Sequence, residues 1–135
     1  MKIALPCLLL VLVPTWAVRA ETFQPAVRDA FEQAQADCES FDAGEFAMTE
    51  AATRRVDLTG NGRDDWVVDT SFMSCSSAAS MYCGTGGCSL VFAAEGSATE
   101  RIAKGWEVVE FSGRPVILLD VHGSLCGGIN PTACV

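Results

Sequence analysis

The sequence predicts a small α+β domain in which one N-terminal helix packs on a mostly antiparallel sheet and disulfides hold the two together. Three observations predict this fold class. A helical stripe of apolar residues occurs once, six short segments rich in β-branched and aromatic residues follow it, and six cysteines are spread over the same region. The chain has no internal repeat or linker, so residues 21–135 are expected to form one disulfide-bonded domain.

The first twenty residues have the pattern of a cleaved export signal. Lys2 gives a positive start, residues 3–13 are almost wholly apolar, and Val18-Arg19-Ala20 offers a cleavage site. This run is too short to cross a membrane, and no other segment reaches the roughly 18 consecutive apolar residues that a span needs. We therefore expect a signal peptide at residues 1–20, a mature chain without a membrane span, and a periplasmic or secreted protein.

The mature chain is strongly acidic. Loss of Lys2 and Arg19 leaves 9 − 2 = 7 basic residues against 17 acidic ones, so the net charge changes from −8 to −10. Such a chain has no electrostatic reason to bind nucleic acid or an anionic membrane. It could attract a cationic protein, although an acidic surface also serves simply to keep an exported protein soluble.

The cysteines indicate an oxidising compartment. Six remain after cleavage, namely Cys38, Cys75, Cys83, Cys88, Cys126 and Cys134. An even number in a short exported chain predicts three disulfides, each worth about 2–4 kcal/mol to so small a core. The short segment CGGINPTAC favours a local Cys126–Cys134 bridge. A redox protein, or a zinc site formed by Cys83, Cys88, Cys126 and Cys134, is the alternative that predicts free thiols.

The helix is expected in TFQPAVRDAFEQAQADCESF, residues 22–41. Its apolar positions recur at steps of three and four and are Phe23, Val27, Phe31, Ala34 and Cys38. Thr22 or Gln24 would lie near the N-cap. Pro25 suits the first turn, because N–H groups there have no acceptor within the helix and proline lacks an N–H. Cys38, at the end of the stripe, would attach the helix to the sheet.

The strands follow from residue 44 onward. They are expected within residues 44–50, 53–58, 66–73, 88–96, 105–111 and 114–122. Ser112-Gly113 predicts a hairpin, and the apolar run at residues 116–121 predicts a central strand. The small-residue segment 74–89 is expected to loop over the sheet. Four aromatic residues are expected in the core, namely Trp66, Phe92, Trp106 and Phe111.

One segment, RRVDLTGNGRDDWVVDT at residues 54–70, has a spacing that predicts chemistry. Counted from Asp57 as position 1, oxygen-bearing side chains occupy positions 1, 3, 5 and 9, a glycine occupies position 6, and Arg63 at position 7 could offer its carbonyl. Alternate side chains of a curled loop converge on one point. Position 12, where an EF-hand carries a bidentate Glu, is Val68.

This segment, DLTGNGRDDWVV, resembles the short calcium loops of FG-GAP and related β-propeller repeats and the first half of an EF-hand loop. The resemblance implies a loop between strands that binds calcium through the side chains of Asp57, Thr59, Asn61 and Asp65 and the carbonyl of Arg63. It covers about a dozen residues and implies no propeller, because the chain has no repeats. The segments SMYCGTGGCSLVF and VHGSLCGG resemble small exported bacterial proteins, which implies no activity.

A metal-free turn explains the same residues. Asn61-Gly62 is a strong two-residue hairpin signal, and Asp57 and Asp65 would then accept hydrogen bonds from turn amides. Two carboxylates at ligand positions imply weak calcium binding, on the order of 10⁻⁴–10⁻³ M as in extracellular modules, with a structural role.

His122, the single histidine, offers the one catalytic interpretation. It could activate Ser124 or Cys126, but a bridged cysteine is no nucleophile, and the segment has neither an acidic partner nor a nucleophile elbow. The sequence therefore predicts an exported, non-enzymatic domain, stabilised by calcium at Asp57–Asp65, that binds another molecule. The alternatives are an acidic inhibitor of a cationic hydrolase such as lysozyme and an envelope hydrolase that uses His122.

Overall fold

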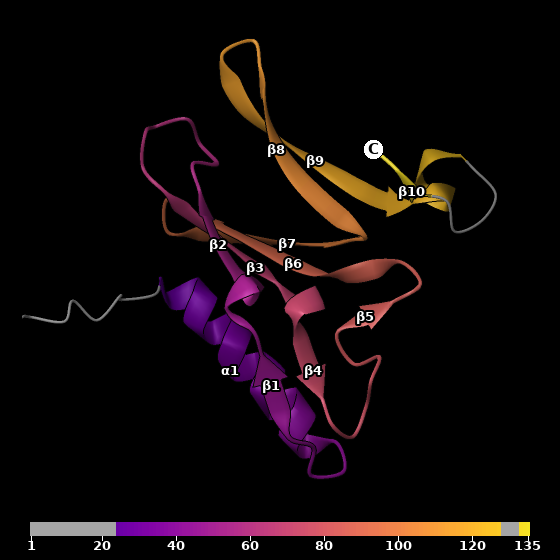
Figure 1. Cartoon of the computed structure of the whole chain (residues 1–135). Helices are drawn as coiled ribbons and strands as arrows, with labels where there is room; N and C mark the ends of the chain where they lie inside the picture. Colours follow the sequence, from indigo (N-terminus) through magenta and orange to yellow (C-terminus); the bar gives the residue numbers. More distant parts are fainter. Residues whose placement is uncertain (1–23, 128–132) are drawn as a thin grey trace, which may run out of the picture.

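The computed structural model of this chain describes residues 24–127 and 133–135, so the predicted signal peptide at residues 1–20 lies outside the described residues. The predicted α+β class is confirmed: helix α1 (Pro25–Ser40) packs on antiparallel sheets (Figure 1). The described strands are β1 (Phe46–Met48), β2 (Thr53–Val56), β3 (Asp65–Asp69), β4 (Met73–Cys75), β5 (Cys83–Gly84), β6 (Gly87–Ala94), β7 (Ser97–Ala103), β8 (Gly105–Phe111), β9 (Arg114–His122) and β10 (Ala133–Cys134). Single 3₁₀ turns occupy Glu50–Ala52, Thr70–Phe72 and Gly123–Cys126.

Helix α1 forms where the apolar stripe predicts it. Val27, Ala34 and Cys38 are buried and Phe31 packs against the same core, while Phe23 lies outside the described residues. Gln24 is the N-cap residue, and its backbone carbonyl accepts the N–H of Val27 at 2.9 Å. Pro25 occupies the first turn, where its missing N–H costs nothing.

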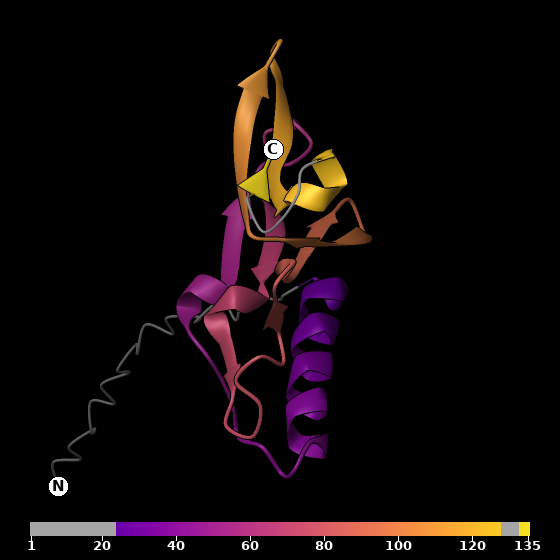
Figure 2. The ribbon, with the colours of Figure 1, turned by 90° about the vertical axis from the view of Figure 1, so that its right-hand side faces the viewer.

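The described strands form three antiparallel sheets. The largest places β2, β3, β6 and β7 side by side, with the short β5 continuing the edge of β6 beyond β3. A pair, β1–β4, and a three-stranded sheet, β10–β9–β8, complete the fold. Helix α1 lies on one side of the largest sheet, and the β8–β9 hairpin lies on the other (Figure 2).

Strand β3 supplies both cores because successive side chains of a strand point to opposite faces. Trp66 and Val68 pack in a core with Val27 of α1, whereas Val67 packs in a second core against the side of β8 and β9. All five residues of β3 are buried. The central strand predicted at residues 116–121 is therefore only partly right. Strand β9 lies in the middle of its own sheet, but most of its residues are half-buried.

Two hairpins have two-residue turns with positive φ. The predicted turn at Ser112-Gly113 is confirmed, with φ values of 53° and 73° between the paired Phe111 and Arg114. Glu95-Gly96 makes the same kind of turn, with φ values of 51° and 79°, and joins β6 to β7. Strand β7 has no signal in the sequence, because its residues are almost all exposed and show no apolar alternation.

The aromatic residues divide between core and surface. Trp66 and Phe92 are buried, and Trp106 packs edge-on against Phe92 with ring centroids 5.8 Å apart. The expectation for Phe111 is wrong, since its side chain is 71% exposed. It precedes the Ser112-Gly113 turn at the end of the hairpin, where the second core no longer covers it.

The six cysteines form the three predicted disulfides. Cys38–Cys75 joins α1 to β4, Cys83–Cys88 joins directly paired residues of β5 and β6, and Cys126–Cys134 is the predicted local bridge. Because all six thiols are bridged, the zinc and free-thiol interpretations are wrong.

Candidate functional site

The Asp57–Asp65 segment connects β2 to β3. Val56 pairs with Asp65, so residues 57–64 form an eight-residue loop between antiparallel strands. The predicted two-residue turn at Asn61-Gly62 is wrong. The left-handed backbone conformations of this loop belong to Gly60 and Gly62, with φ values of 75° and 77°, and they curl the loop around Asp57.

The carboxylate of Asp57 is the centre of this loop. Its Oδ1 accepts the N–H groups of Thr59, Gly60 and Asn61 at 3.2, 2.6 and 3.2 Å, and its Oδ2 accepts that of Gly62 at 2.7 Å. These hydrogen bonds, above all the one from Gly62, hold the pKa of Asp57 below its ordinary value of 3.8. Asp57 is therefore anionic at neutral pH, and its charge organises the loop.

The other predicted ligands take part in the same network. Asn61 Oδ1 accepts the N–H of Arg63 at 2.8 Å, and Thr59 Oγ1 lies 3.5 Å from Asp57 Oδ1. Asp65 is 4% exposed, and its Oδ2 accepts the N–H of Leu58 at 3.0 Å at the base of the loop. The amide contacts of Asp57 and Asp65 are those that the metal-free interpretation predicts.

Two contacts outside the network hold the loop on the body of the protein. Asn61 Nδ2 donates to Glu95 Oε1 at 3.4 Å, and Asp64 lies 3.4 Å from Arg55. Across the residues that the structure describes, no group of three or more His, Cys, Asp and Glu side chains gathers as a metal cluster. A cation in this loop would therefore depend on amide, hydroxyl and carbonyl oxygens as well as on carboxylates.

His122 makes its contacts within one turn. Its Nδ1 lies 2.8 Å from Ser124 Oγ and accepts the N–H of Ser124 at 3.3 Å. The pair caps the Gly123–Cys126 turn. Cys126 is bridged and supplies no nucleophile, whereas a catalytic role of His122 with Ser124 stays a prediction.

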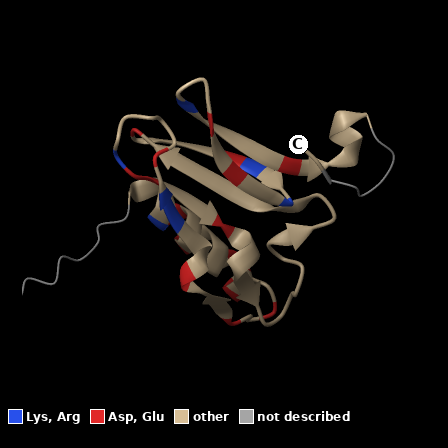
Figure 3. Ribbon diagram, turned by 45° about the horizontal axis from the view of Figure 1, so that its top comes forward, with Lys and Arg blue, Asp and Glu red and all other residues tan. Residues whose placement is uncertain are grey.

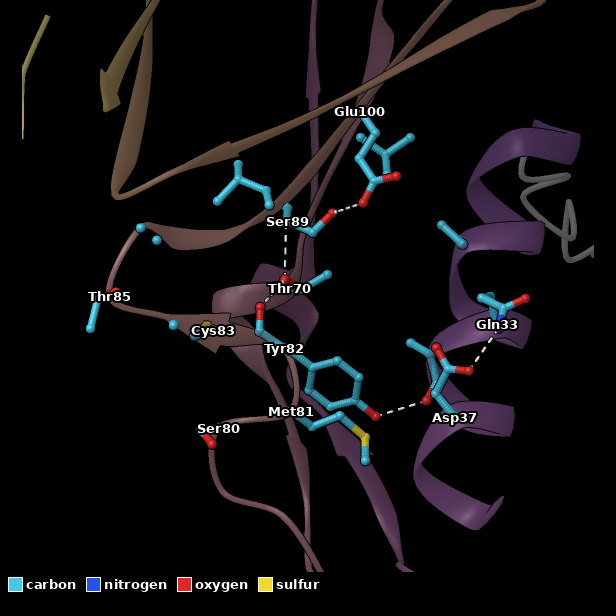
Figure 4. Close-up of a pocket in the computed structure, with 17 residues that line it drawn as sticks. Gln33, Asp37, Thr70, Ser80, Met81, Tyr82, Cys83, Thr85, Ser89 and Glu100 are labelled. Carbon is cyan, nitrogen blue, oxygen red and sulfur yellow. Dashed lines mark hydrogen bonds between the residues drawn. The ribbon is translucent and has the colours of Figure 1, made fainter. Parts of the chain in front are cut away.

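A groove that the sequence analysis missed lies between α1 and the β5–β7 side of the largest sheet (Figure 4). It has a volume of about 590 Å³. Its walls come from one side of α1, the glycine-rich turn between β5 and β6, and the helix-facing residues of β6 and β7. The polar and aromatic groups on these walls include Gln33, Asp37, Thr70, Tyr82, Ser89 and Glu100.

Hydrogen bonds fix the side chains of this groove. Tyr82 donates its hydroxyl to the carbonyl of Ala34 at 2.7 Å, and its ring packs edge-on against Phe46. Burial, and then the negative charge of Asp37, raise the pKa of Tyr82 above its ordinary value of 10.0. The Asp37 carboxylate accepts from Gln33 Nε2 at 2.7 Å, and Ser89 Oγ donates to the carboxylate of Glu100.

Residues 25–50, which include α1, are strongly acidic. Residues 25–50 carry one basic residue, Arg28, which lies 3.5 Å from both Asp29 and Glu32. The acidic residues of this region are Asp29, Glu32, Asp37, Glu39, Asp42, Glu45 and Glu50. The region thus contributes 1 − 7 = −6 to the net charge, and acidic positions lie along α1 in Figure 3, where they are red.

Comparison with known proteins gave no match to a family model, a curated protein or a solved structure. Within the described residues, no helix has the length and apolar character needed to cross a bilayer. The groove brings α1 together with Tyr82, β6 and β7, which lie far from the helix in the sequence. In the sequence, the run of small residues at 83–87 is the one local feature that indicates this groove.

Proposed function

We propose that this chain is an exported, non-enzymatic binding domain that recognises a cationic partner through the groove between α1 and β5–β7. The observation that carries the proposal is the presence of two carboxylates, Asp37 from α1 and Glu100 from β7, on separate walls of one hollow. A basic hydrolase such as lysozyme is the partner class that this charge favours.

The chemistry of the groove suits a lysine or arginine side chain. A cation between Asp37 and Glu100, whose carboxylates are exposed, would make charge-assisted hydrogen bonds, each worth about 0.2–1 kcal/mol. The ring of Tyr82 lies in the same hollow, and Ile102, which is 63% exposed, offers apolar surface for the methylene stem. The acidic region at residues 25–50 would speed the encounter with a basic protein at low ionic strength.

The test compares two double variants that remove the same charge. Asp37→Asn with Glu100→Gln should weaken binding to lysozyme at low ionic strength by about tenfold or more, equivalent to about 1.4 kcal/mol. Glu107→Gln with Glu110→Gln, on β8 across the largest sheet, should have a much smaller effect. Titration calorimetry at low and moderate salt measures both.

Equal weakening by the two double variants would mean that net charge alone drives binding, and the groove would then have no special role. If the wild-type protein binds neither lysozyme nor any other cationic hydrolase at low ionic strength, the proposal of a cationic partner fails.

We also propose that the Asp57–Asp65 loop binds calcium as a structural ion, through Asp57, Thr59, Asn61 and Asp65 and the carbonyl of Arg63. Two observations support this proposal. The lowered pKa of Asp57 keeps its carboxylate charged, and Asp65 carries a second carboxylate at the base of the same loop. Calcium would further stabilise a loop that is already held in shape by hydrogen bonds from its own backbone amides.

Thermal melting in millimolar calcium and in chelator tests the calcium proposal. A calcium concentration ten times the dissociation constant should raise the free energy of unfolding by about 1.4 kcal/mol. Asp57→Ala should abolish this response, whereas Asp64→Asn, which removes an acidic residue off the ligand pattern, should keep it. If calcium has no effect on the wild type, the loop is a metal-free turn.

A further inference from the structure

We propose that β7 is a docking edge, to which an extended segment of the cationic partner adds as a further strand. This inference rests on the proposed function and deepens it, because it states how the partner's backbone is held while its basic side chains enter the groove.

The first observation is the open edge of β7. Its seven residues pair with β6, from Ser97 opposite Ala94 to Ala103 opposite Cys88, and no described strand pairs with the other edge. Six of the seven residues are exposed, and only Ala103 is buried. The outward N–H and C=O groups of such an edge form a template for another strand, which here would replace the guanidinium group of Arg101 that donates to the carbonyl of Glu100 at 2.7 Å.

The second observation is a hollow on each face of β7. Glu100 and Ile102 line the groove beside α1. Ser97, Thr99 and Arg101 line a second hollow of about 360 Å³, which lies towards β9. Since side chains of an added strand point alternately to the two faces, one set would lie beside the groove and the other beside the second hollow.

The two hollows differ in chemistry, and this difference determines which side-chain pattern of the partner's segment fits β7. The groove carries Asp37 and Glu100 and suits basic residues. The second hollow has a floor of Phe92, Ile117 and Leu119 and suits apolar residues. The guanidinium group of Arg101 repels a cation from that face. The structure therefore favours a segment in which basic and apolar residues alternate.

The edges of β2 and β8 are poorer candidates. Strand β2 carries Arg54 and Arg55, whose guanidinium groups lie over the rings of Trp106 and Trp66 and would repel a basic segment. Strand β8 has four half-buried residues among its seven. Among the described strands, only β7 combines a long exposed edge with an acidic hollow on one face and an apolar hollow on the other.

The probe is a synthetic heptapeptide, Lys-Val-Lys-Val-Lys-Val-Lys, and the measurement is residue-resolved amide hydrogen exchange by NMR. On binding, every second amide of residues 97–103 should exchange about tenfold more slowly, because these amides change from solvent to peptide carbonyls as partners. The intervening amides, which bond to β6, should change little.

Two control peptides separate backbone pairing from charge attraction. A heptapeptide that is N-methylated at alternate residues on the pairing edge keeps its side chains but loses its donors, and it should bind at least about tenfold more weakly. A peptide of the same composition with its four lysines and three valines in two blocks should also bind more weakly. Equal affinity for all three peptides, or no binding of the alternating peptide, overturns the docking edge.

The outcomes distinguish this inference from the proposed function. If Asp37→Asn with Glu100→Gln weakens peptide binding while the β7 amides stay unprotected, the groove stands and the docking edge is wrong. If the β7 amides become protected in wild type and double variant alike, with equal affinity, the docking edge stands and the groove does not contribute.

Discussion

Gly87 lies where the turn between β5 and β6 passes the end of β7. Its φ of +119° is a conformation that residues with side chains rarely adopt, and a Cβ there would overlap the carbonyl of Ala103. Gly87→Ala should therefore lower the free energy of unfolding by about 1–3 kcal/mol. Urea denaturation measures this loss. Gly84→Ala, in the same hairpin but with open space around its Cα, should cost less than about 0.5 kcal/mol. A similar loss in both variants would contradict the close contact.

Asp57 makes the stability of the loop depend on pH. Its folded pKa lies below the ordinary value of 3.8, so its contribution is full above that value and is lost as the pH falls through the lower, folded pKa. Asp57→Asn should therefore flatten the fall of stability below about pH 4, because the amide does not titrate. Urea unfolding between pH 2 and pH 6 in chelator measures this dependence. Asp64→Asn should retain the wild-type slope, and equal slopes for Asp57→Asn and the wild type would contradict the prediction.

The loop between Asp57 and Asp65 shows how much of its hydrogen bonding could be predicted from the sequence. The spacing of Asp57, Thr59 and Asn61 was enough to predict that they belong to one hydrogen-bond network, because residues so close along the chain share a turn. Which oxygens each would bond could not be predicted. The turn conformation depends on Gly60 as well as Gly62, and the eight-residue length depends on the pairing of Val56 with Asp65.

The disulfides close loops of very different lengths. Cys38–Cys75 spans 37 residues and Cys83–Cys88 spans 5. In the chain-entropy model, loss of the first bridge should cost about 4 kcal/mol and loss of the second about 2 kcal/mol. Paired Cys→Ser replacements, measured by urea unfolding, test this order. The reverse order would show that local strain or packing, rather than loop closure, decides what each bridge contributes.

At the level of elements, local signals were sufficient for α1 and the β8–β9 hairpin. The helix follows from a stripe within sixteen residues, and the hairpin follows from two runs around Ser112-Gly113. Strand β7 has no such signal. Its exposed residues become a strand because the Glu95-Gly96 turn brings them back along β6, which pairs with them over their whole length, and the residues themselves show no alternation.

The whole molecule is held together by two cores on opposite faces of one sheet. Val68 is buried with α1, and Val67, the preceding residue, is buried on the side of β8 and β9. Val67→Ala and Val68→Ala should each lower the free energy of unfolding by about 1.5–3 kcal/mol. Both should shift a single transition, because β3 and β6 contribute to both cores and neither core persists without them.

Tryptophan fluorescence can follow the two cores separately. Trp66 reports on the helix-side core and Trp106 on the second core. Trp66→Phe and Trp106→Phe isolate each signal in turn, and the two denaturation curves should coincide after correction for each variant's stability. Two separated transitions would show that the β8–β9 sheet unfolds independently of the helix and the largest sheet.

The sequence by itself determined the composition of this fold: one amphipathic helix, several strands, a three-disulfide framework and an Asp-centred loop. These features follow from residues that lie close together along the chain or from the number of cysteines. Only the tertiary structure decided the pairing of Cys38 with Cys75, the exposure of Phe111 and the groove that holds Asp37 and Glu100 on separate walls. These features depend on contacts between distant segments, and they form only when the sheet has brought α1, β6 and β7 together.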